Sequence, residues 1–439
     1  MTVIRLSKVG ESQAAANSGA LVAALDIGST KIGCLIGETV ARKHRAPDGE
    51  DLPKLRVLGV GHQASRGMRN GAVIDVDQAE RAIRLAVDQA ERMAKRTITE
   101  VYVNVSGGRP RSTRYSASVK TTGGQVMRAD CDAVIAGAVA QIASGKRRVL
   151  HVSPMQYHLD DARGISAPQG MHGDLLAVDI NAVCAEQAAL RNLALVVERC
   201  HLAVAGYAIA PYAAARAVLA PDEMKLGSTL IDIGGATTGI SVFRDGHLIF
   251  ADVAAVGGHH ITSDLARGLS TTLAHAERMK TLYGSAIPSI VDEREMVAVP
   301  LLGERGVDTV HHVPRSMLTG IIRPRLEEMF EMIRDRLGEA GLGKGPEGPV
   351  VITGGTSQLT GLRDMAQQWL NRPVRLGSPY PLEGLPEAAA TPAFAVAAGL
   401  LAYALKPDQH AVTSDYAGAG GVEGRSYLRR VGRWIAESF

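Results

Sequence analysis

The sequence predicts an α/β protein that contains two similar lobes, and three observations support this prediction. The sequence contains three apolar runs, of which the first begins near Leu21, the second ends at Ile233 and the third ends at Thr353. They show no alternation of polar and apolar residues, as is typical of parallel strands covered on both faces. Each run leads directly into a loop that contains glycine. The sequence DIGSTKIG at 26–33 recurs as DIGGATTG at 232–239, which indicates that each lobe begins with a strand–turn–strand hairpin.

The composition is that of a globular protein rather than a disordered or fibrous one. The chain has 439 residues, of which 46% are hydrophobic and 21% are charged, and this length predicts about two to four domains. The net charge of +3 is too small to indicate a nucleic-acid-binding protein, so we expect no nucleic-acid partner. Four widely spaced cysteines favour free thiols in a reducing cytoplasm. The longest apolar run, at 393–405, is shorter than the roughly 20 residues of a membrane-spanning helix, so we expect a buried helix and a chain that does not cross a membrane.

Helices and one compact insert separate the apolar strands. Apolar residues at helical spacing predict helices over 75–96, 185–219 and 315–340. The segment 101–174 combines several strand-like runs with one helix around 130–144, which indicates a small separate α+β subdomain. The polar residues 1–20 have the composition of a flexible extension, and the Gly- and Ala-rich residues 406–424 that of a flexible linker.

The first repeated loop has the residues of a phosphate-binding turn. A tight turn there exposes consecutive backbone N–H groups and the hydroxyl groups of Ser29 and Thr30, while Lys31 adds a positive charge. Asp26 can hold a hydrated Mg²⁺ ion, because Mg²⁺ usually keeps several waters and takes one or two carboxylates. The second loop repeats this design, with Asp232 as the second carboxylate. Considered alone, either loop is better explained as an ordinary hairpin turn than as a phosphate site.

A third loop, at 351–362, favours a nucleotide site over two ordinary turns. Its double glycine follows a buried strand and lets a planar ligand approach the backbone closely. The candidate cofactor-binding residues of the three loops are Gly28, Ser29, Thr30, Lys31, Gly234, Gly235, Ala236, Thr237, Thr238, Gly354, Gly355 and Thr356, with Asp26 and Asp232 as the candidate catalytic and metal-binding pair. In these segments the chain resembles the actin-like ATPase superfamily, whose phosphate-1, phosphate-2 and adenosine motifs they match. The resemblance implies ATP and Mg²⁺ as cofactors.

Further segments resemble one family of that superfamily, the FtsA family of bacterial cell-division proteins. The resemblance covers about residues 21–405 and the tail, and its most specific segments are SRGMRNG at 65–71, VYVNVSG at 101–107, RRVLHVSPMQY at 147–157 and AERMKTLYGSA at 276–286. It implies a two-lobed actin-like fold in which the insert at 101–174 is subdomain 1C. The other implied parts are subdomain 1A at 21–100 and 175–224, 2A at 225–255 and 346–392, 2B at 256–345, and a helix returning to 1A at 393–405.

The resemblance also implies that Glu277 and Lys280 lie near the adenosine, although their helix could instead present a solvated charged face. One departure from the superfamily concerns ATP hydrolysis. Actin-like ATPases usually carry a Gln or Glu that orients the attacking water on the helix linking the lobes, whereas 206–220 contains neither residue and has Ala210 before Pro211. Because such positioning contributes substantially to phosphoryl transfer, we expect tight ATP binding and at most a slow ATPase.

The C-terminal residues RSYLRRVGRWIAESF, at 425–439, are amphipathic when they are placed on a helix. Their apolar side chains span an arc of about 140°, and the arginines lie on the opposite side. Four arginines and one glutamate give this tail the whole net charge of +3. Such a helix suits the surface of an anionic bilayer, although it could also dock on the protein's own body or on a partner. The candidate membrane-binding residues are Tyr427, Leu428, Arg429, Arg430, Val431, Arg433, Trp434, Ile435 and Phe439.

The resemblance to the FtsA family implies a structural, ATP-binding cell-division protein. Such a protein would form actin-like filaments at the cytoplasmic face of the inner membrane, at the division site, and would tether filaments of the tubulin-like FtsZ. The implied contacts are the FtsZ C-terminal tail on segment 313–333, and the next subunit and later division proteins on subdomain 1C. Arg315 and Arg325 are candidate anchors for the acidic FtsZ peptide, or else ordinary surface arginines.

Other members of the superfamily provide the alternative functions. A metabolic enzyme such as a sugar kinase or an exopolyphosphatase needs an Asp or Glu base in a substrate pocket, and no loop of this sequence combines such a base with sugar-binding residues. An Hsp70-like chaperone needs a large substrate-binding domain after the ATPase body. A plasmid-segregating actin homologue would share the three loops but not the insert or the tail.

Overall fold

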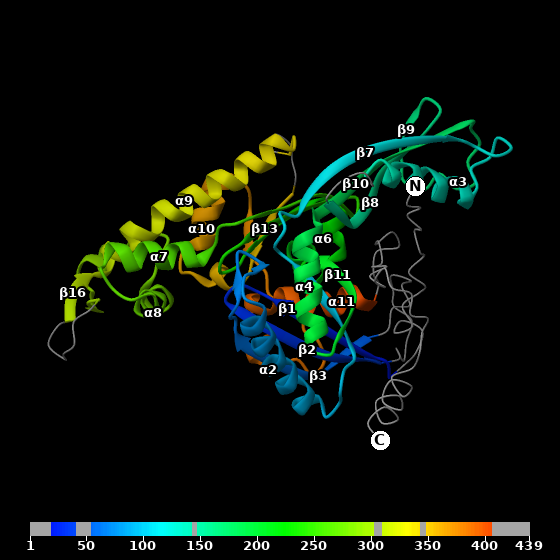
Figure 1. Ribbon diagram of the computed structural model, residues 1–439. Helices are drawn as coiled ribbons and strands as arrows, with labels where there is room; N and C mark the ends of the chain where they lie inside the picture. The colour runs from blue at the N-terminus through cyan, green and yellow to red at the C-terminus, as the bar shows by residue number, and fades with distance from the viewer. Residues whose placement is uncertain (1–18, 41–53, 143–146, 303–309, 343–347, 406–439) are drawn as a thin grey trace, which may run out of the picture.

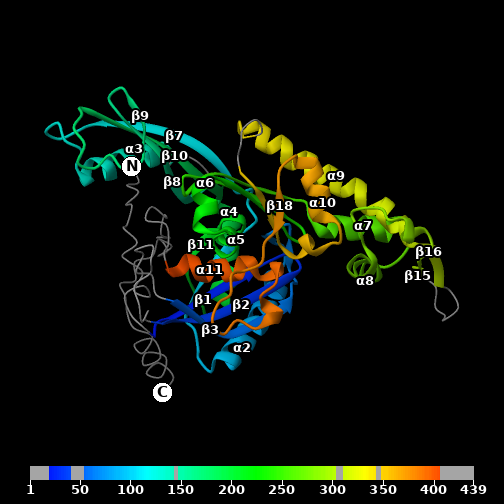
Figure 2. The same ribbon diagram turned by 180° about the vertical axis from the view of Figure 1, so that it is seen from behind.

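The chain folds into two lobes and one insert, as the computed structural model shows for residues 19–40, 54–142, 147–302, 310–342 and 348–405 (Figure 1). The first lobe is built around a five-stranded sheet, and the second lobe lies beside the first. In Figure 1 the insert and the outer part of the second lobe project in opposite directions above the first lobe, and the view from behind in Figure 2 shows the same arrangement. The two-lobed α/β fold predicted from the sequence is therefore confirmed.

The sheet of the first lobe has the strand order β11-β6-β1-β2-β3. Its strands are β1 (Leu21–Ile27), β2 (Lys31–Val40), β3 (Lys54–Ala64), β6 (Glu100–Val105) and β11 (Ala203–Ile209), and a small separate ribbon consists of β4 (Met68–Arg69) and β5 (Ala72–Val73). β6 runs parallel to β1 and β11, whereas β2 is antiparallel to both of its neighbours. Every residue of β1 after Leu21 is buried, which confirms that this apolar run is a strand covered on both faces.

Helices cover both faces of this sheet. α2 (Val76–Ala94) packs on β2 and β3, and α11 (Ala395–Leu405) packs on β1 and β6 from the opposite side (Figure 1). α4 (Gln187–Arg199) lies beside α2, α5 (Ala210–Val218) lies beside α11, and the short α6 (Pro221–Leu226) follows α5. α11 and α5 approach so closely that a Cβ atom at Gly399 would lie 1.7 Å from the carbonyl oxygen of Ala213. The apolar run at 393–405 is thus a buried helix, as predicted.

The second lobe continues the pattern with its own sheet and helices. Its strands are β12 (Ser228–Ile233), β13 (Thr238–Arg244), β14 (His247–Ala254), β17 (Val350–Thr353) and β18 (Val374–Leu376), and α10 (Leu362–Leu370) packs beside β18. Its outer part consists of α7 (Gly258–Gly268), α8 (Leu273–Tyr283), η1 (Ile290–Glu293), the hairpin β15 (Met296–Pro300) and β16 (Val310–Pro314), and α9 (Arg315–Glu339). One apolar core joins this outer part to the sheet, because Ile261, Met279 and Leu326 pack in the same cluster as Ile231.

The sequence repeat corresponds to two hairpins with the same register. In the first hairpin Asp26 is the cross-strand partner of Gly33, and in the second Asp232 is the partner of Gly239. Each turn is closed by a hydrogen bond between equivalent backbone groups, from the N–H of Gly28 to Lys31 (3.0 Å) and from that of Gly234 to Thr237 (2.9 Å). The repeated Asp therefore occupies the same position at the mouth of the turn in both lobes.

The insert is a sheet covered by one helix. Its elements are β7 (Arg111–Lys120), α3 (Arg128–Ala140), β8 (Arg147–Leu159), β9 (Ala162–Ile165) and β10 (Leu175–Glu186). The sequence placed the insert at 101–174, but β10 pairs with both β7 and β8, while residues 100–105 belong to the sheet of the first lobe. The strands of the insert therefore extend from 111 to 186. The single pair Asp252–Arg111 joins β14 to β7, so the insert and the second lobe share one nine-stranded sheet.

Some predictions fall outside the described residues, namely most of the extension at 1–20, the linker at 406–424 and the amphipathic helix at 425–439. Short 3₁₀ segments η2 (Gly355–Gln358), η3 (Glu387–Ala389) and η4 (Pro392–Phe394) complete the described elements. No helix within the described ranges combines the length and the apolar character needed to cross a bilayer. The four cysteines are free, as predicted.

Candidate functional site

A cavity of about 510 Å³ lies between the two lobes and brings the three glycine loops together. The predicted residues that line it are Asp26, Gly28, Ser29, Thr30, Lys31, Asp232, Gly234, Gly235, Ala236, Thr237, Glu277, Lys280, Gly354, Gly355 and Thr356. Thr238 does not line it, because this residue is buried in β13 and its hydroxyl donates a hydrogen bond to the carbonyl of Val256 (2.8 Å). One cavity thus receives loops that are more than 300 residues apart in the chain.

The two hairpin turns approach each other closely at the cavity. A Cβ atom at Gly235 would lie 2.3 Å from Cγ2 of Thr30, so a side chain at this position would clash with Thr30 of the other turn. The second turn also supports the start of α7, because its Gly234 and Gly235 carbonyls accept hydrogen bonds from the N–H groups of Gly258 (3.0 Å) and His259 (2.6 Å). A ligand with several phosphate groups can therefore contact both lobes at once.

The segment 65–71 positions the hydroxyl of the first turn. The backbone N–H of Gly71 donates a hydrogen bond to Oγ of Ser29 (3.0 Å), and the N–H of Ser65 donates to the carbonyl of Thr30 (2.9 Å). Gly71 is required here, because it has a φ of +74° and a Cβ atom would lie 2.6 Å from the amide nitrogen of Gly107. Since Ser29 accepts from Gly71, its own hydrogen can point toward a phosphate oxygen.

Two carboxylates meet at this site, and both are almost fully buried. Asp26 is 7% exposed and Asp232 is 8% exposed. The pKa of Asp26 is raised to about 6, mainly by burial, and that of Asp232 to about 7 by burial and by the charge of Asp26. The charge of Lys31 opposes both shifts. Both pKa shifts mean that two negative charges are unfavourable here without a nearby cation. A cation would relieve this repulsion, so the pair fits a hydrated Mg²⁺ ion.

Position 354, next to Asp232, has no room for a side chain. Gly354 has a φ of +87°, and a Cβ atom there would lie 2.4 Å from Oδ1 of Asp232.

Among the described residues, no three His, Cys, Asp or Glu side chains form a group that could enclose a metal. A metal at this place would therefore use the two carboxylates and complete its shell with water or ligand oxygens, as Mg²⁺ commonly does.

Lys31 is held by groups from the far end of the chain. Its ammonium nitrogen donates a hydrogen bond to the carbonyl of Ala393 (2.6 Å) and lies 3.3 Å from the centre of the Phe394 ring. Burial lowers the pKa of Lys31, while the charges of Asp26 and Asp232 counteract this effect. Both Lys31 and Ala393 line the cavity.

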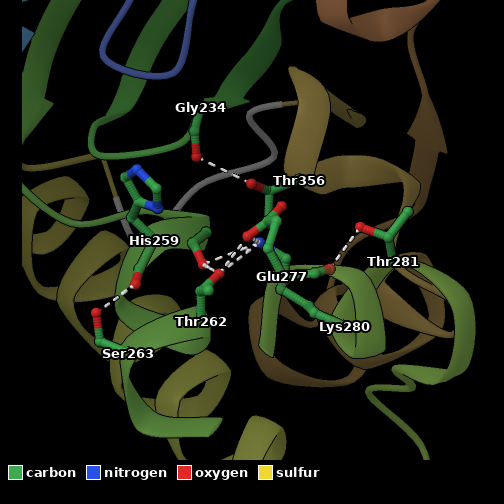
Figure 3. A network of polar contacts seen from close by, with 9 residues as sticks. Gly234, His259, Thr262, Ser263, Glu277, Lys280, Thr281 and Thr356 are labelled. Atoms are coloured by element: carbon green, nitrogen blue, oxygen red, sulfur yellow. Dashed lines mark hydrogen bonds and ion pairs between the residues drawn. The ribbon is translucent and has the colours of Figure 1, made fainter. Parts of the chain in front are cut away.

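A polar network around Lys280 lines another part of the cavity, where the family resemblance implies the adenosine (Figure 3). The ammonium of Lys280 donates hydrogen bonds to Glu277 (2.7 Å), to Oγ1 of Thr262 (2.9 Å) and to the carbonyl of Gly258 (3.1 Å). Burial raises the pKa of Glu277, but the hydrogen bonds from Lys280 and Thr262 outweigh this effect and hold the pKa below its ordinary value. Thr356 donates to the carbonyl of Gly234 (2.9 Å), which ties the third loop to the second.

Several lining residues were not among the site residues predicted from the sequence. They are Asn104, Ser106, His259, Thr281, Gly284, Gln358, Leu359, Thr360, Pro392, Ala393 and Val396. Asn104 has a clear role, because its side-chain oxygen accepts a hydrogen bond from the N–H of Ile27 (2.7 Å) and so anchors the first turn. A polar residue within the apolar strand EVYVNV was the one signal in the sequence that could have indicated it.

The remaining predicted residues occupy two other places. Ala210 lines the cavity at the start of α5, where it presents only a methyl group. Arg315 and Arg325 lie on α9, outside the cavity, and both are engaged within the chain. Arg315 donates to Glu295 (2.8 Å) and to the carbonyl of Tyr283 (2.8 Å), and Arg325 makes two hydrogen bonds to Asp264 (2.6 and 3.1 Å).

Comparisons with known proteins agree with this geometry. Residues 229–399 match the family model "Cell division protein FtsA", and residues 107–184 match the model "SHS2 domain inserted in FTSA". The cell division protein FtsA of Rhizobium meliloti (strain 1021) is 45% identical over 426 residues, 95% of each chain, and that of Escherichia coli (strain K12) is 32% identical over 432 residues, 95% of this chain and 98% of the relative.

Among solved structures, the PilM-PilN type IV pilus biogenesis complex contains a chain with the same fold. It superimposes with a TM-score of 0.60 and covers 88% of this chain and 99% of its own, but its sequence identity of 16% supports a likeness of fold alone. The extensive identity to two cell division proteins, together with the paired hairpins and the insert, shows that the chain belongs to the FtsA family of cell-division proteins, within the actin-like ATPase superfamily.

Proposed function

We propose that this cell-division protein binds Mg²⁺·ATP between its lobes, polymerises at the cytoplasmic face of the inner membrane at the division site, and tethers FtsZ filaments there. The observation that carries the proposal is the pairing of two equivalent hairpin turns, with Asp26 and Asp232, around one cavity. The backbone N–H and hydroxyl groups of the two turns, the ammonium of Lys31 and the two carboxylates complement a triphosphate with its magnesium ion.

The division of labour among the residues follows from this complementarity. Asp26 and Asp232 would hold Mg²⁺, which supplies positive charge against the phosphates when it is bound. The turn residues Ser29, Thr30 and Thr237 would donate to phosphate oxygens, and Glu277 and Lys280, which line the same cavity, would lie near the adenosine. A methyl group at Ala210 cannot orient a water molecule for attack, so we expect ATP to act mainly as a structural ligand that holds the lobes together, with slow hydrolysis.

Membrane attachment is the task of the tail at 425–439, which lies outside the described residues. A basic amphipathic helix of this length is marginally stable in water and would order on an anionic lipid surface. A single such helix gives weak, reversible binding, whereas many helices on one filament bind far more strongly through their high effective concentration. Polymerisation and membrane attachment would therefore support each other.

Protein partners would bind at the two projecting ends of the molecule. The insert would contact the next subunit and later division proteins, and segment 313–333 would receive the acidic FtsZ tail. Arg315 and Arg325 already pair with Glu295 and Asp264, so a peptide carboxylate would have to compete with these side chains. We therefore expect a modest affinity for the peptide, which multiple contacts along paired filaments would amplify.

Co-sedimentation with vesicles of phosphatidylglycerol tests this function. The full chain with Mg²⁺·ATP is expected to sediment with these vesicles and to bring FtsZ with it. The chain lacking 425–439 should stay in the supernatant yet still bind ATP, and neutral vesicles serve as the lipid control. Equal sedimentation of the shortened chain would contradict the role of the tail. Rapid phosphorylation of a sugar, or rapid polyphosphate cleavage, would favour the metabolic enzyme instead.

A further inference from the structure

We propose that Phe394 is a positioning residue of the phosphate site: together with the carbonyl of Ala393, its ring holds the Lys31 ammonium away from Asp26 and Asp232. This inference rests on the proposed binding of Mg²⁺·ATP in the cavity. It adds a residue that lies in none of the three glycine loops and that does not itself line the cavity. Phe394 belongs to η4, directly before α11, at the point where the chain returns from the second lobe to the first.

The ammonium of Lys31 has two nearby carboxylates but is bound elsewhere. Asp26 and Asp232 are buried, and opposite charges attract more strongly where burial reduces the screening by water, so a lysine in such surroundings would ordinarily form an ion pair. In the part of the chain that the structure describes, however, Lys31 forms no ion pair within 4.0 Å with either Asp26 or Asp232. Its ammonium instead lies 3.3 Å from the centre of the Phe394 ring and 2.6 Å from the carbonyl oxygen of Ala393.

These two groups can compensate for the missing ion pair. The negative face of an aromatic ring attracts a cation, and this attraction is largest where water is excluded. The carbonyl oxygen accepts one of the three ammonium hydrogens, which leaves others to point into the cavity. The carboxylate oxygens consequently remain available for a hydrated magnesium ion, and the lysine remains available for a phosphate.

The ring of Phe394 is well fixed for this task. Phe394 is 7% exposed, and its backbone N–H donates a hydrogen bond to the carbonyl of Thr391 (2.9 Å). The ring of His62, on β3, meets it edge-on with the ring centres 6.0 Å apart. Cε1 of the Phe394 ring lies 3.9 Å from the position of a Cβ atom on Gly33, so the ring rests on the first hairpin. Contacts with β2 and β3 thus keep the ring over Lys31.

The test is a double-mutant cycle between Phe394 and Lys31, measured as ATP affinity at several Mg²⁺ concentrations with the full chain. Phe394→Leu should weaken Mg²⁺·ATP binding by about 2- to 30-fold, the range expected for a cation–π contact, because Lys31 then collapses onto the carboxylates. The variant should also need more Mg²⁺ for half-maximal binding. In a Lys31→Met background, where no ammonium remains, Phe394→Leu should change neither quantity.

Conservative variants separate positioning from a loss of structure. Phe394→Tyr keeps the aromatic face and should show nearly normal ATP affinity and Mg²⁺ dependence. Phe394→Met has a similar volume but no ring, so it should behave like Phe394→Leu. The methionine variant replaces the leucine variant if the latter does not fold. An equal loss of affinity with and without Lys31, or an unchanged Mg²⁺ requirement, would overturn the inference. If the wild-type chain binds no ATP, the proposed function fails; if it binds ATP and Phe394→Leu binds equally well, only this inference fails.

Discussion

Asp26 and Asp232 come from different lobes and line the same cavity, and the negative charge of Asp26 raises the pKa of Asp232. Each residue is the partner of a glycine in an equivalent hairpin, so the repeat in the sequence produces a pair of opposed carboxylates in space. A site that keeps two buried acids together has to be compensated by a cation or by protonation.

The stability of the nucleotide-free protein should depend on pH through these two acids. Their pKa values of about 6 and about 7 lie above the ordinary aspartate value of about 3.9, so the folded protein binds more protons than the unfolded chain between about pH 4 and pH 7. Their contribution to the free energy of unfolding therefore falls as the pH rises through this window and stays low above it. Asp232→Asn should stabilise the protein at pH 8 by roughly 1–3 kcal/mol, with little effect near pH 4.5. Urea unfolding without nucleotide or Mg²⁺ measures this difference, and a difference that is independent of pH would contradict it.

Gly354 should not tolerate a side chain. Gly354→Ala places a Cβ atom against Oδ1 of Asp232 and forces a residue other than glycine to a φ of +87°, so we expect a loss of about 1–3 kcal/mol in stability and weaker ATP binding. Gly355→Ala is the matched control for stability, because the nearest atom to its Cβ would be 3.8 Å away, in ordinary contact. Thermal unfolding of both variants decides the matter. Similar melting temperatures for the two variants would show that the close approach is not required.

The close packing of α5 against α11 should be equally sensitive to an added side chain. Gly399→Ala brings a Cβ atom to 1.7 Å from the carbonyl oxygen of Ala213, so the helices must separate, at a cost of about 1–3 kcal/mol. Gly320→Ala, on α9, provides the opposite case, since a Cβ atom there would meet nothing within 4 Å. Replacing an exposed helical glycine in this way should stabilise the protein by about 0.5–1 kcal/mol. Denaturant unfolding should therefore move the two midpoints in opposite directions.

An amide side chain at position 210 should increase the ATPase activity of the protein. Ala210→Gln places an amide in the cavity, where it can orient a water molecule, and we expect phosphate release to increase by about tenfold or more. Ala203→Gln, at the exposed beginning of β11, makes the same replacement away from the cavity and should leave the rate unchanged. Steady-state phosphate release measures both variants. An unchanged rate in Ala210→Gln would mean that a missing amide does not limit hydrolysis.

The residues of the site were predictable from the sequence where they act through local turns. Gly28–Lys31 and Gly234–Thr237 are contiguous, and their glycines, hydroxyls and repeated Asp indicate a phosphate turn without knowledge of the rest of the chain. Thr238 could not be assigned in this way, because it begins β13 and its side chain points to Val256 rather than into the cavity. Alternation along a strand decides such orientations only once the register is known.

Other features depend on contacts between distant parts of the chain. Ala393 reaches Lys31 only because α11 returns to the first lobe, and nothing in the sequence near either residue indicates this contact. The end of the insert was misplaced for a similar reason. Residues 175–186 continue from the insert into the first lobe without a turn or a change in composition, and pairing with β7 and β8 shows that they belong to the insert.

Titration of the nucleotide-free protein with ATP, with and without Mg²⁺, tests the central claim most directly. If the two carboxylates hold the magnesium ion of a bound nucleotide, Mg²⁺ should tighten ATP binding in the wild-type chain. Asp232→Ala should abolish this effect, whereas Asp222→Ala, an exposed aspartate on α6, should retain it. An ATP affinity that is independent of both Mg²⁺ and Asp232 would contradict the account.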